Sequence, residues 1–503
     1  MSTNDFPGCR QRSDRMANAV NFVDLDEVAI NPSCAMQVPA EFAFDRQALP
    51  LCIVDGDMIV ALPDVSDVRT LAEIRRELDM PVIGVRAEAE QLKRFLSKVY
   101  GGVSAALQDS MSDDAVSTVD YLLRLAFMRH ASDIHFDPDE NGMRVRFRID
   151  GELEDVVRIS PDRQASVISR LKVMGEVKLD ERRAPQDGAF SWRVPDAFAN
   201  GTSALDVRLA TLPGHYGEKV TLRLLETDSR RFTVDALGMT TSDRAVFEGV
   251  LAAPHGLVLL TGPTGSGKTT TLYAAIQHLL TLRPLNIVTV ENPIEYEIPG
   301  IFQAEVDAVD KVNFTKALRS ILRHDPDVIM IGEIRDQESL DTAVKAALTG
   351  HLVLSTLHTN DSVNAVTRLA NMGLERHLIA ATLRLSVAQR LVRALCPHCR
   401  EQYLAGEEDM LRLGRPDVAG RAFYRPHGCV FCAGRGLRGR LGLFELFRMD
   451  ADIASAIADG ANEHVLRTLH RERGGRILVD DGVEKCLAGL TTVDEVSRVS
   501  SFV

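Results

Sequence analysis

The stretch from Gly256 to Thr270 constrains the fold of this chain more than any other part of its sequence. An apolar run of strand length leads into Gly-Pro-Thr-Gly-Ser-Gly-Lys-Thr, and a helical pattern follows from about Thr270 to Leu282. A strand, a glycine-rich loop and a helix in this order are the context in which the G-x-x-x-x-G-K-T motif forms a phosphate-binding loop. An ordinary glycine-rich turn is the alternative, and it does not explain the complete motif in this context.

This loop predicts a nucleotide site. Its backbone N–H groups and the N-terminus of the following helix are expected to surround phosphate oxygens. We expect Lys268 to reach the β- and γ-phosphates of ATP, and the Thr269 hydroxyl to bind Mg²⁺. The residues expected to contact the nucleotide are Gly262, Pro263, Thr264, Gly265, Ser266, Gly267, Lys268, Thr269 and Thr270.

Apolar strands alternate with helices between Val234 and about Leu391, which predicts an α/β fold with a parallel sheet covered on both faces. Ligands bind at the carboxyl ends of the strands in such a sheet. Three polar residues, Glu291, Glu333 and His358, fall at or just beyond predicted strand ends. We therefore expect them to converge with Lys268 on one site.

Each of these three residues has a role that an ATPase needs. Glu291 is a candidate to orient or deprotonate the attacking water, and Glu333 is placed to act on Mg²⁺ or its waters. His358 is a candidate sensor of the γ-phosphate. Any one of them alone is more typical of a satisfied structural polar group, but the set around a complete phosphate loop favours an ATPase.

Two segments precede the nucleotide domain. The first, 1–105, shows a hairpin signal and no catalytic pattern, and we interpret it as a docking module. A linker is expected over Gly101–Asp114. The second segment, from Ala115 to about Thr227, has strands in which arginines alternate with apolar residues, and two of these strands carry Arg208 and Arg223. Those arginines form either a solvated sheet face or a source of positive charge for the phosphates.

The eight cysteines form two groups. Four of them make two C-x-x-C pairs, at Cys396, Cys399, Cys429 and Cys432. Four thiolates are enough for a closed tetrahedral Zn²⁺ site with no open coordination position, and His398 is a competing ligand. A thioredoxin-like redox pair is the alternative, and it leaves the second pair unexplained. The other cysteines, Cys9, Cys34, Cys52 and Cys486, are interpreted as free thiols.

The composition limits the classes of function. A chain of 503 residues is too long for one core, and 45% hydrophobic and 26% charged residues are ordinary for a globular protein. The formal net charge of −13 argues against a non-specific nucleic-acid binder and against a helicase-like motor. We find no apolar run of about 18 residues and no signal peptide, so we expect a cytosolic protein.

These motifs closely resemble those of the type II secretion ATPases, within the superfamily of secretion and type IV pilus motor ATPases. The resemblance covers about residues 115–500. It rests on a Walker A motif, an Asp box, a Walker B segment and a His box, which lie at Gly262–Thr269, Glu291–Glu295, Asp325–Asp336 and Thr349–Asp361. The four-cysteine module marks the branch of the superfamily that drives secretion and pilus extension.

The resemblance implies a RecA-like P-loop ATPase domain with a parallel sheet, preceded by two smaller α/β domains, the second PAS-like, and carrying a four-cysteine zinc module. The implied domains are an N-terminal docking domain (1–105), a second, arginine-bearing domain (115–230), the P-loop ATPase core (234–391), the four-cysteine zinc module (392–445) and a C-terminal helical subdomain (446–503). Arg208 and Arg223 become candidate stabilisers of nucleotide charge, on a domain joined to the core by a flexible stretch near Thr227–Arg231. One departure is Asn292, where the family usually has Asp, so the hydrogen-bond role of that Asp is altered.

The function implied is an ATPase motor that drives pseudopilus assembly and protein export, and type IV pilus extension is the alternative. A nucleic-acid motor and a nucleotide switch without turnover are disfavoured by the acidic charge and by the complete set of carboxylates. The resemblance further implies a homo-oligomer, most commonly a hexamer, lying peripherally on the cytoplasmic face of the inner membrane. Its implied partners are an inner-membrane secretion protein bound through 1–105, a polytopic platform protein and acidic phospholipid, with no nucleic acid.

Overall fold

The computed structural model describes residues 22–35, 37–100, 114–194, 204–225, 233–306 and 314–500. The chain divides into two compact units. The N-terminal unit comprises Met1–Thr227, Cys396–Glu401 and Pro426–Arg438, and the C-terminal unit comprises Asp228–Leu395, Gln402–Arg425 and Gly439–Val503. The expected flexible stretch Thr227–Arg231 lies outside the described residues, as does the expected linker Gly101–Asp114 except for its last residue.

The first part of the N-terminal unit is a three-stranded sheet with helices. The predicted hairpin is confirmed, because β1 (Leu49–Val54) and β2 (Asp57–Leu62) pair antiparallel. Strand β3 (Val82–Arg86) then pairs parallel with β2, after a crossover through a helix. The helices of this part are α2 (Pro32–Ala35), α3 (Ala40–Arg46), α4 (Val68–Leu78) and α5 (Ala89–Tyr100).

The second part of the N-terminal unit is a six-stranded antiparallel sheet in the order β6-β5-β4-β9-β8-β7. Its strands are β4 (Ala131–Asp139), β5 (Gly142–Ile149), β6 (Glu152–Ile159), β7 (Gln186–Arg193), β8 (Ala204–Gly214) and β9 (Gly217–Leu225). Apolar residues of the sheet pack with helices α6 (Ala115–Met128) and α7 (Pro161–Met174) in one core. The arginines that alternate with them therefore lie on the opposite face of the sheet.

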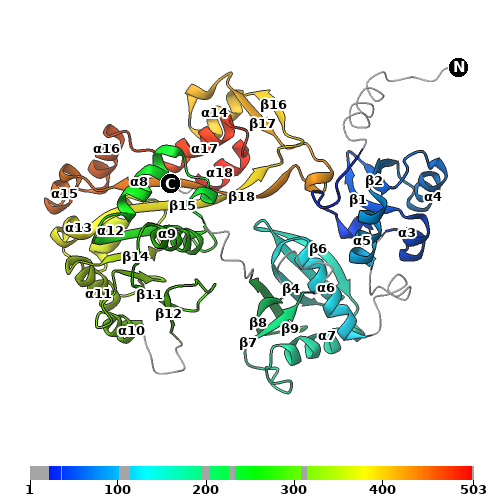
Figure 1. Ribbon diagram of the computed structural model, residues 1–503, viewed down its shortest axis with the longest axis horizontal. Helices are drawn as coiled ribbons and strands as arrows, with labels where there is room; N and C mark the ends of the chain where they lie inside the picture. Colours follow the sequence, from blue (N-terminus) through cyan, green and yellow to red (C-terminus); the bar gives the residue numbers. More distant parts are fainter. Residues whose placement is uncertain are drawn as a thin grey trace. The chain divides into compact units, whose positions relative to one another are not determined.

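The C-terminal unit is built on a seven-stranded sheet in the order β12-β11-β13-β14-β10-β15-β18 (Figure 1). The first six strands in this order pair parallel, as predicted for the nucleotide domain. The strands are β10 (Gly256–Thr261), β11 (Ile287–Glu291), β12 (Phe302–Glu305), β13 (Val328–Ile331), β14 (Leu352–Leu357), β15 (Leu383–Leu395) and β18 (Leu437–Arg448).

Helices cover both faces of this sheet. Leu257 and Leu259 of β10 belong to a core shared with α10 (Phe314–Ile321), α11 (Gln337–Leu348), α12 (Asn364–Asn371) and α13 (Arg376–Thr382). Val258 and Leu260 belong to a second core with α8 (Thr241–Leu251) and α9 (Lys268–Leu282). The short helix η4 (Val234–Leu237), which precedes α8 in the chain, contributes to the same core. Strand β10 is therefore buried on both sides, which explains its continuous apolar sequence.

The rest of the C-terminal unit consists mainly of helices. A two-stranded sheet pairs β16 (Glu401–Leu404) with β17 (Ala422–Arg425), and α14 (Glu407–Leu413) and the short η5 (Pro416–Val418) lie between them in the chain. The chain ends in α15 (Ala451–Ala458), α16 (Glu463–Glu472), α17 (Leu478–Leu487) and α18 (Val493–Ser500). Within the part of the chain that the structure describes, no helix combines the length and apolar character needed to cross a membrane.

A buried ion pair in the second part of the N-terminal unit generates a stability prediction. The Lys172 ammonium lies 2.9 and 3.1 Å from the two carboxylate oxygens of Glu218, and the side chains are 1% and 6% exposed. Lys172→Met strands the Glu218 charge and is expected to cost about 3–5 kcal/mol of unfolding free energy. Trp192, the one tryptophan of the chain, lies in this core, so its fluorescence during urea unfolding measures the loss.

The matched control is the double variant Lys172→Met/Glu218→Leu. It removes both charges and keeps apolar volume, so most of the lost free energy should return. A double variant as unstable as Lys172→Met alone would show that the cavity, and not the stranded carboxylate, causes the loss.

Candidate nucleotide and metal sites

The phosphate loop lies at the carboxyl end of β10, between that strand and helix α9. Gly262 has φ 144° and Gly267 has φ 88°, which is the left-handed region that favours glycine. A Cβ on Gly262 would lie 2.6 Å from the Gln389 carbonyl oxygen and 2.6 Å from the Ser266 hydroxyl oxygen. The loop therefore packs too closely against β15 for any other residue at position 262.

The loop has polar groups placed for a phosphate. The Lys268 ammonium donates to the carbonyl oxygens of Gly262 and Pro263, at 2.8 and 3.0 Å. The Ser266 hydroxyl is buried and has no hydrogen-bond partner among the described residues. Burial lowers the pKa of Lys268, and the nearby Glu333 charge opposes that shift. A phosphate oxygen would satisfy the Ser266 hydroxyl and give the Lys268 charge a counter-ion, so the residues present fit a nucleotide phosphate.

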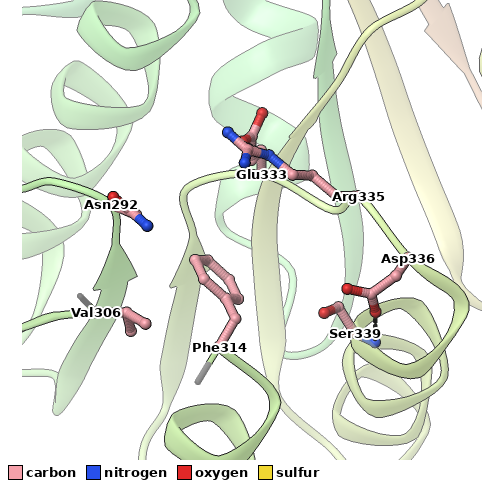
Figure 2. Close-up of a pocket in the computed structure, with 7 residues that line it drawn as sticks. All are labelled: Asn292, Val306, Phe314, Glu333, Arg335, Asp336 and Ser339. Atoms are coloured by element: carbon pink, nitrogen blue, oxygen red, sulfur yellow. Dashed lines mark hydrogen bonds and ion pairs between the residues drawn. The ribbon is translucent and has the colours of Figure 1, made fainter. Parts of the chain in front are cut away.

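Glu333 and His358 meet at this edge of the sheet. His358 follows β14 directly, and its Nε2 lies 3.2 Å from Glu333 Oε2. Glu333 follows β13 by two residues, and its other oxygen pairs with Arg335 (Figure 2). The Glu333 charge raises the pKa of Lys268 against the effect of burial, so the two side chains are close to each other. Lys268, Glu333 and His358 are therefore together, which accounts for three of the four residues expected to converge on one site.

Glu291 is the last residue of β11, and its environment differs from that of Glu333. Its side chain is buried and accepts hydrogen bonds from Tyr273, Thr289 and Gln303. The Glu333 side chain is 23% exposed. The two carboxylates therefore stand at neighbouring strand ends, one enclosed and one open to solvent.

A cavity of about 200 Å³ opens beside Glu333. Figure 2 shows Asn292 on one side of it and Asp336 and Ser339 on the other, with Glu333 above the Phe314 ring in this view. Arg335, Asp336 and Ser339 also line it, and the Ser339 backbone N–H donates to Asp336 at 2.8 Å. The position at which this sequence departs from the resemblance, Asn292, thus lines a cavity that also contains the Glu333 carboxylate.

The four paired cysteines form a compact cluster in the N-terminal unit. Their sulfur atoms all lie within 4.8 Å of one another, and three pairs are 3.7, 3.8 and 3.8 Å apart. A tetrahedral site with metal–sulfur bonds of about 2.3 Å requires sulfur atoms about 3.8 Å apart. Backbone N–H groups of Gly428, Cys429 and Gly436 donate to the sulfurs, which favours thiolates. The cluster therefore fits a tetrathiolate metal site.

His398 does not compete for that site. Its ring stacks on Phe431 with 4.0 Å between centroids, and it is outside the ligand cluster. The cluster is closed, since three of its cysteines are buried and Cys429 is half-buried. The geometry thus favours a structural metal over a catalytic one.

Comparison with known proteins decides the family. A family model described as type II/IV secretion system protein matches residues 110–498, which is more than half of the chain. This chain belongs to the type II/IV secretion system protein family. A model described as MshEN domain matches residues 18–106.

Relatives and solved structures agree with this family. The type II secretion system protein E of Pseudomonas aeruginosa is 40% identical over 503 residues, 95% of this chain and 98% of that protein. The type II secretion system ATPase E of Vibrio cholerae is 43% identical over 390 residues, 77% of this chain and 76% of that protein. The pilus retraction motor PilT with bound ADP is 25% identical, with a TM-score of 0.51 over 75% of this chain and 96% of that chain.

The Legionella pneumophila ATPase DotB shares the fold, at 21% identity and a TM-score of 0.57 over 78% of this chain and 96% of that chain. The predicted fold class is confirmed, and this member of the secretion family is a P-loop ATPase.

Arg208 and Arg223 lie in the N-terminal unit, whereas the phosphate loop lies in the C-terminal unit. They stand directly opposite each other on β8 and β9. The Arg223 guanidinium donates to Asp133 at 3.1 Å and its side chain is 63% exposed. Their action on a nucleotide stays a prediction for this secretion ATPase.

Sequence reasoning missed two residues behind the loop, Gln389 and Arg390 of β15. The Gln389 side-chain oxygen accepts from the Thr271 hydroxyl of α9 at 2.8 Å. Arg390 is buried and donates to the Asn360 carbonyl at 2.8 Å, which joins β15 to the segment after β14. The sequence alone does not separate them from the other polar residues of β15, Arg384, Ser386 and Arg393.

The open position of Glu333 generates a prediction. Glu333→Gln keeps the shape of the side chain and removes its charge, so the variant should bind ATP and hydrolyse it at least about tenfold more slowly. Nucleotide binding by calorimetry and phosphate release measured together check this. Glu472→Gln, an exposed change at the end of α16, is the control and should turn over normally. Loss of ATP binding in Glu333→Gln would show that the residue is structural.

Proposed function

We propose that this ATPase converts ATP to ADP and phosphate to drive pseudopilus assembly and protein export in a type II secretion system. One observation carries the proposal. A complete phosphate loop, an open carboxylate and a histidine meet at one sheet edge, in a chain with relatives named type II secretion system protein E over nearly their whole length. The same motor acting in type IV pilus extension is the competing function.

The site residues divide the chemistry among them. Lys268 leaves the carbonyl oxygens of its own loop and binds the β- and γ-phosphates, while Ser266 donates to a phosphate oxygen. Thr269 and Glu333 would hold a Mg²⁺ ion, which would neutralise charge on the phosphates. Glu291 accepts the proton of the attacking water, and His358 contacts the γ-phosphate. Arg208 and Arg223 neutralise the charge that develops in the transition state.

The function can be tested by deleting the gene in its host cells and complementing the deletion. Cells lacking this gene should retain exported proteins, and the wild-type gene should restore export. Lys268→Ala should not restore it, because the γ-phosphate loses its cation. Normal export from the deleted strain, together with loss of surface pili, would assign the motor to pilus extension.

We expect partners at the membrane. The docking module, 1–105, is proposed to bind the cytoplasmic part of an inner-membrane secretion protein, and the motor is proposed to act on a polytopic platform protein. The ATPase then lies peripherally on the cytoplasmic face, in contact with acidic phospholipid. Purified protein should hydrolyse ATP faster when the docking partner and acidic vesicles are both present, and single-stranded DNA should have no effect.

The metal is proposed to be zinc, which takes four thiolates in structural sites. Protein purified without chelator should contain one zinc per chain by elemental analysis. Cys432→Ser should lower that content and destabilise the module, because metal binding contributes folding free energy. Cys486→Ser, which changes a buried cysteine outside the cluster, is the matched control and should keep its zinc. A protein free of zinc with a stable module would contradict the assignment.

The active form is proposed to be a homo-oligomer, most simply a hexamer. Motors with a P-loop commonly receive an arginine from another domain or subunit, and this arginine raises kcat by a factor of about 10³–10⁵. Turnover per chain should therefore rise with protein concentration. Arg208→Ala and Arg223→Ala should lower kcat far more than they weaken ATP binding. Constant turnover by a monomer, with both variants fully active, would refute this assembly.

A further inference from the structure

Three side chains hold the buried Glu291 carboxylate. Tyr273 donates its hydroxyl to Oε2, while Thr289 and Gln303 donate to Oε1 at 2.6 and 3.0 Å. A carboxylate offers about four acceptor positions, so one remains after these three bonds. Glu291 is only 3% exposed, and hydrogen bonds hold both of its carboxylate oxygens. The carboxylate therefore has one orientation, with one acceptor position left for a further donor.

The donors come from different elements. Thr289 lies on β11 and Gln303 on β12, so both belong to the sheet that carries Glu291 itself. Tyr273 lies on α9, the helix that begins at Lys268 of the phosphate loop. Among the described residues, Tyr273 is therefore the donor that connects Glu291 to the helix behind the phosphates.

The Tyr273 hydroxyl also reaches the segment after β11. It accepts a hydrogen bond from the Glu295 backbone N–H at 3.3 Å, and its ring packs edge-on against Tyr296. The residue is fully buried. Burial, followed by the Glu291 charge, raises the pKa of Tyr273, so the hydroxyl stays protonated and remains a donor.

We infer that Tyr273 is a positioning residue for Glu291. Its hydroxyl fixes the rotation of the carboxylate so that the remaining acceptor position faces the attacking water. It also sets the distance between that carboxylate and the phosphate loop, because Tyr273 and Lys268 share one rigid helix. This inference rests on the proposed role of Glu291 as the base for that water.

A merely structural tyrosine would give a different result from a positioning one. The ring fills the core, and Tyr273→Phe keeps the ring while removing the hydroxyl. If packing is its whole role, the variant should behave as wild type in both binding and turnover. If the hydroxyl aims Glu291, the loss falls on kcat, since ATP binding depends on the loop and not on this carboxylate.

The test is Tyr273→Phe in the full chain, with kcat from phosphate release and the ATP dissociation constant from calorimetry. We expect kcat to fall roughly 10- to 100-fold, which is the range for losing a hydrogen bond to a charged group. The dissociation constant should stay within about twofold, because the loop is unchanged. Wild-type kcat in Tyr273→Phe would overturn the inference.

Tyr100→Phe is the matched control. The Tyr100 hydroxyl is also buried and donates to the Ala35 carbonyl oxygen at 2.6 Å, but it lies in the N-terminal unit. Removing it deletes one buried tyrosine hydrogen bond without touching the ATPase core. Tyr100→Phe should keep the wild-type kcat, and an equal fall in kcat in both variants would overturn a specific role for Tyr273.

A double variant separates this inference from the proposed function. If Tyr273 acts through Glu291, adding Tyr273→Phe to Glu291→Gln should lower kcat no further. A full additional loss would overturn the inference while leaving the base assignment intact. Wild-type turnover in Glu291→Gln alone would instead refute the base assignment, and the inference with it.

A second variant, at the residue that donates to the other oxygen of Glu291, keeps the inference testable if Tyr273→Phe fails to fold. Thr289→Val removes the donor to Oε1 at nearly constant volume and should reduce kcat with ATP binding kept. Thr289→Ser restores the hydroxyl and should recover most of the rate. If Thr289→Val and Thr289→Ser both turn over at the wild-type rate, the carboxylate needs no such positioning and the inference is wrong.

Discussion

The two-sided burial of β10 is the constraint on which the rest of the nucleotide site depends. Parallel pairing sets Thr261 of β10 opposite Leu357 of β14 and Ala388 of β15. The residues after β10 and β14 therefore begin their loops at the same edge of the sheet, while β15 continues past it. A slip of one residue would move a strand by about 3.3 Å and turn its apolar side chains from one core to the other. The packing of the two cores thus fixes the position of each side chain predicted for the nucleotide site.

Much of this edge could be predicted from the sequence, because strand ends are local features. Glu333 and His358 follow apolar runs, and the parallel sheet brings the ends of those runs together. The contacts of Glu291 could not be predicted in this way. Tyr273 is separated from it by 18 positions, and the two meet only when α9 packs on the sheet. The sequence predicted a helix that contains Tyr273 without indicating what its hydroxyl would bind.

Other misses have the same physical origin. Strands β7 and β12 were not predicted, because their packing within the fold determines them more than local propensity does. Helix α7 was missed although Pro161 at its start is a local signal. Gln389 and Arg390 of β15 were not among the predicted residues, and they are buried because partners from other elements satisfy them. The sequence spacing did indicate the four-cysteine cluster, since each C-x-x-C pair is local. It did not indicate that the chain leaves the N-terminal unit after Glu401 and returns at Pro426.

That path gives the cysteine cluster a topological role. The cluster joins positions 33 residues apart, on either side of a segment that belongs to the other unit. A metal held there closes a loop, and the entropy of loop closure grows only slowly with loop length. A bound ion would therefore hold together the two points at which the chain leaves the N-terminal unit and returns to it.

The hydrogen bonds of Lys268 to its own loop have a consequence for the motor cycle. In this structure two carbonyl oxygens occupy the donors that a phosphate would otherwise receive. A phosphate that binds Lys268 must therefore replace these two hydrogen bonds, so each binding event exchanges one set of bonds for another. Such an exchange keeps net affinity modest while preserving the shape of the loop.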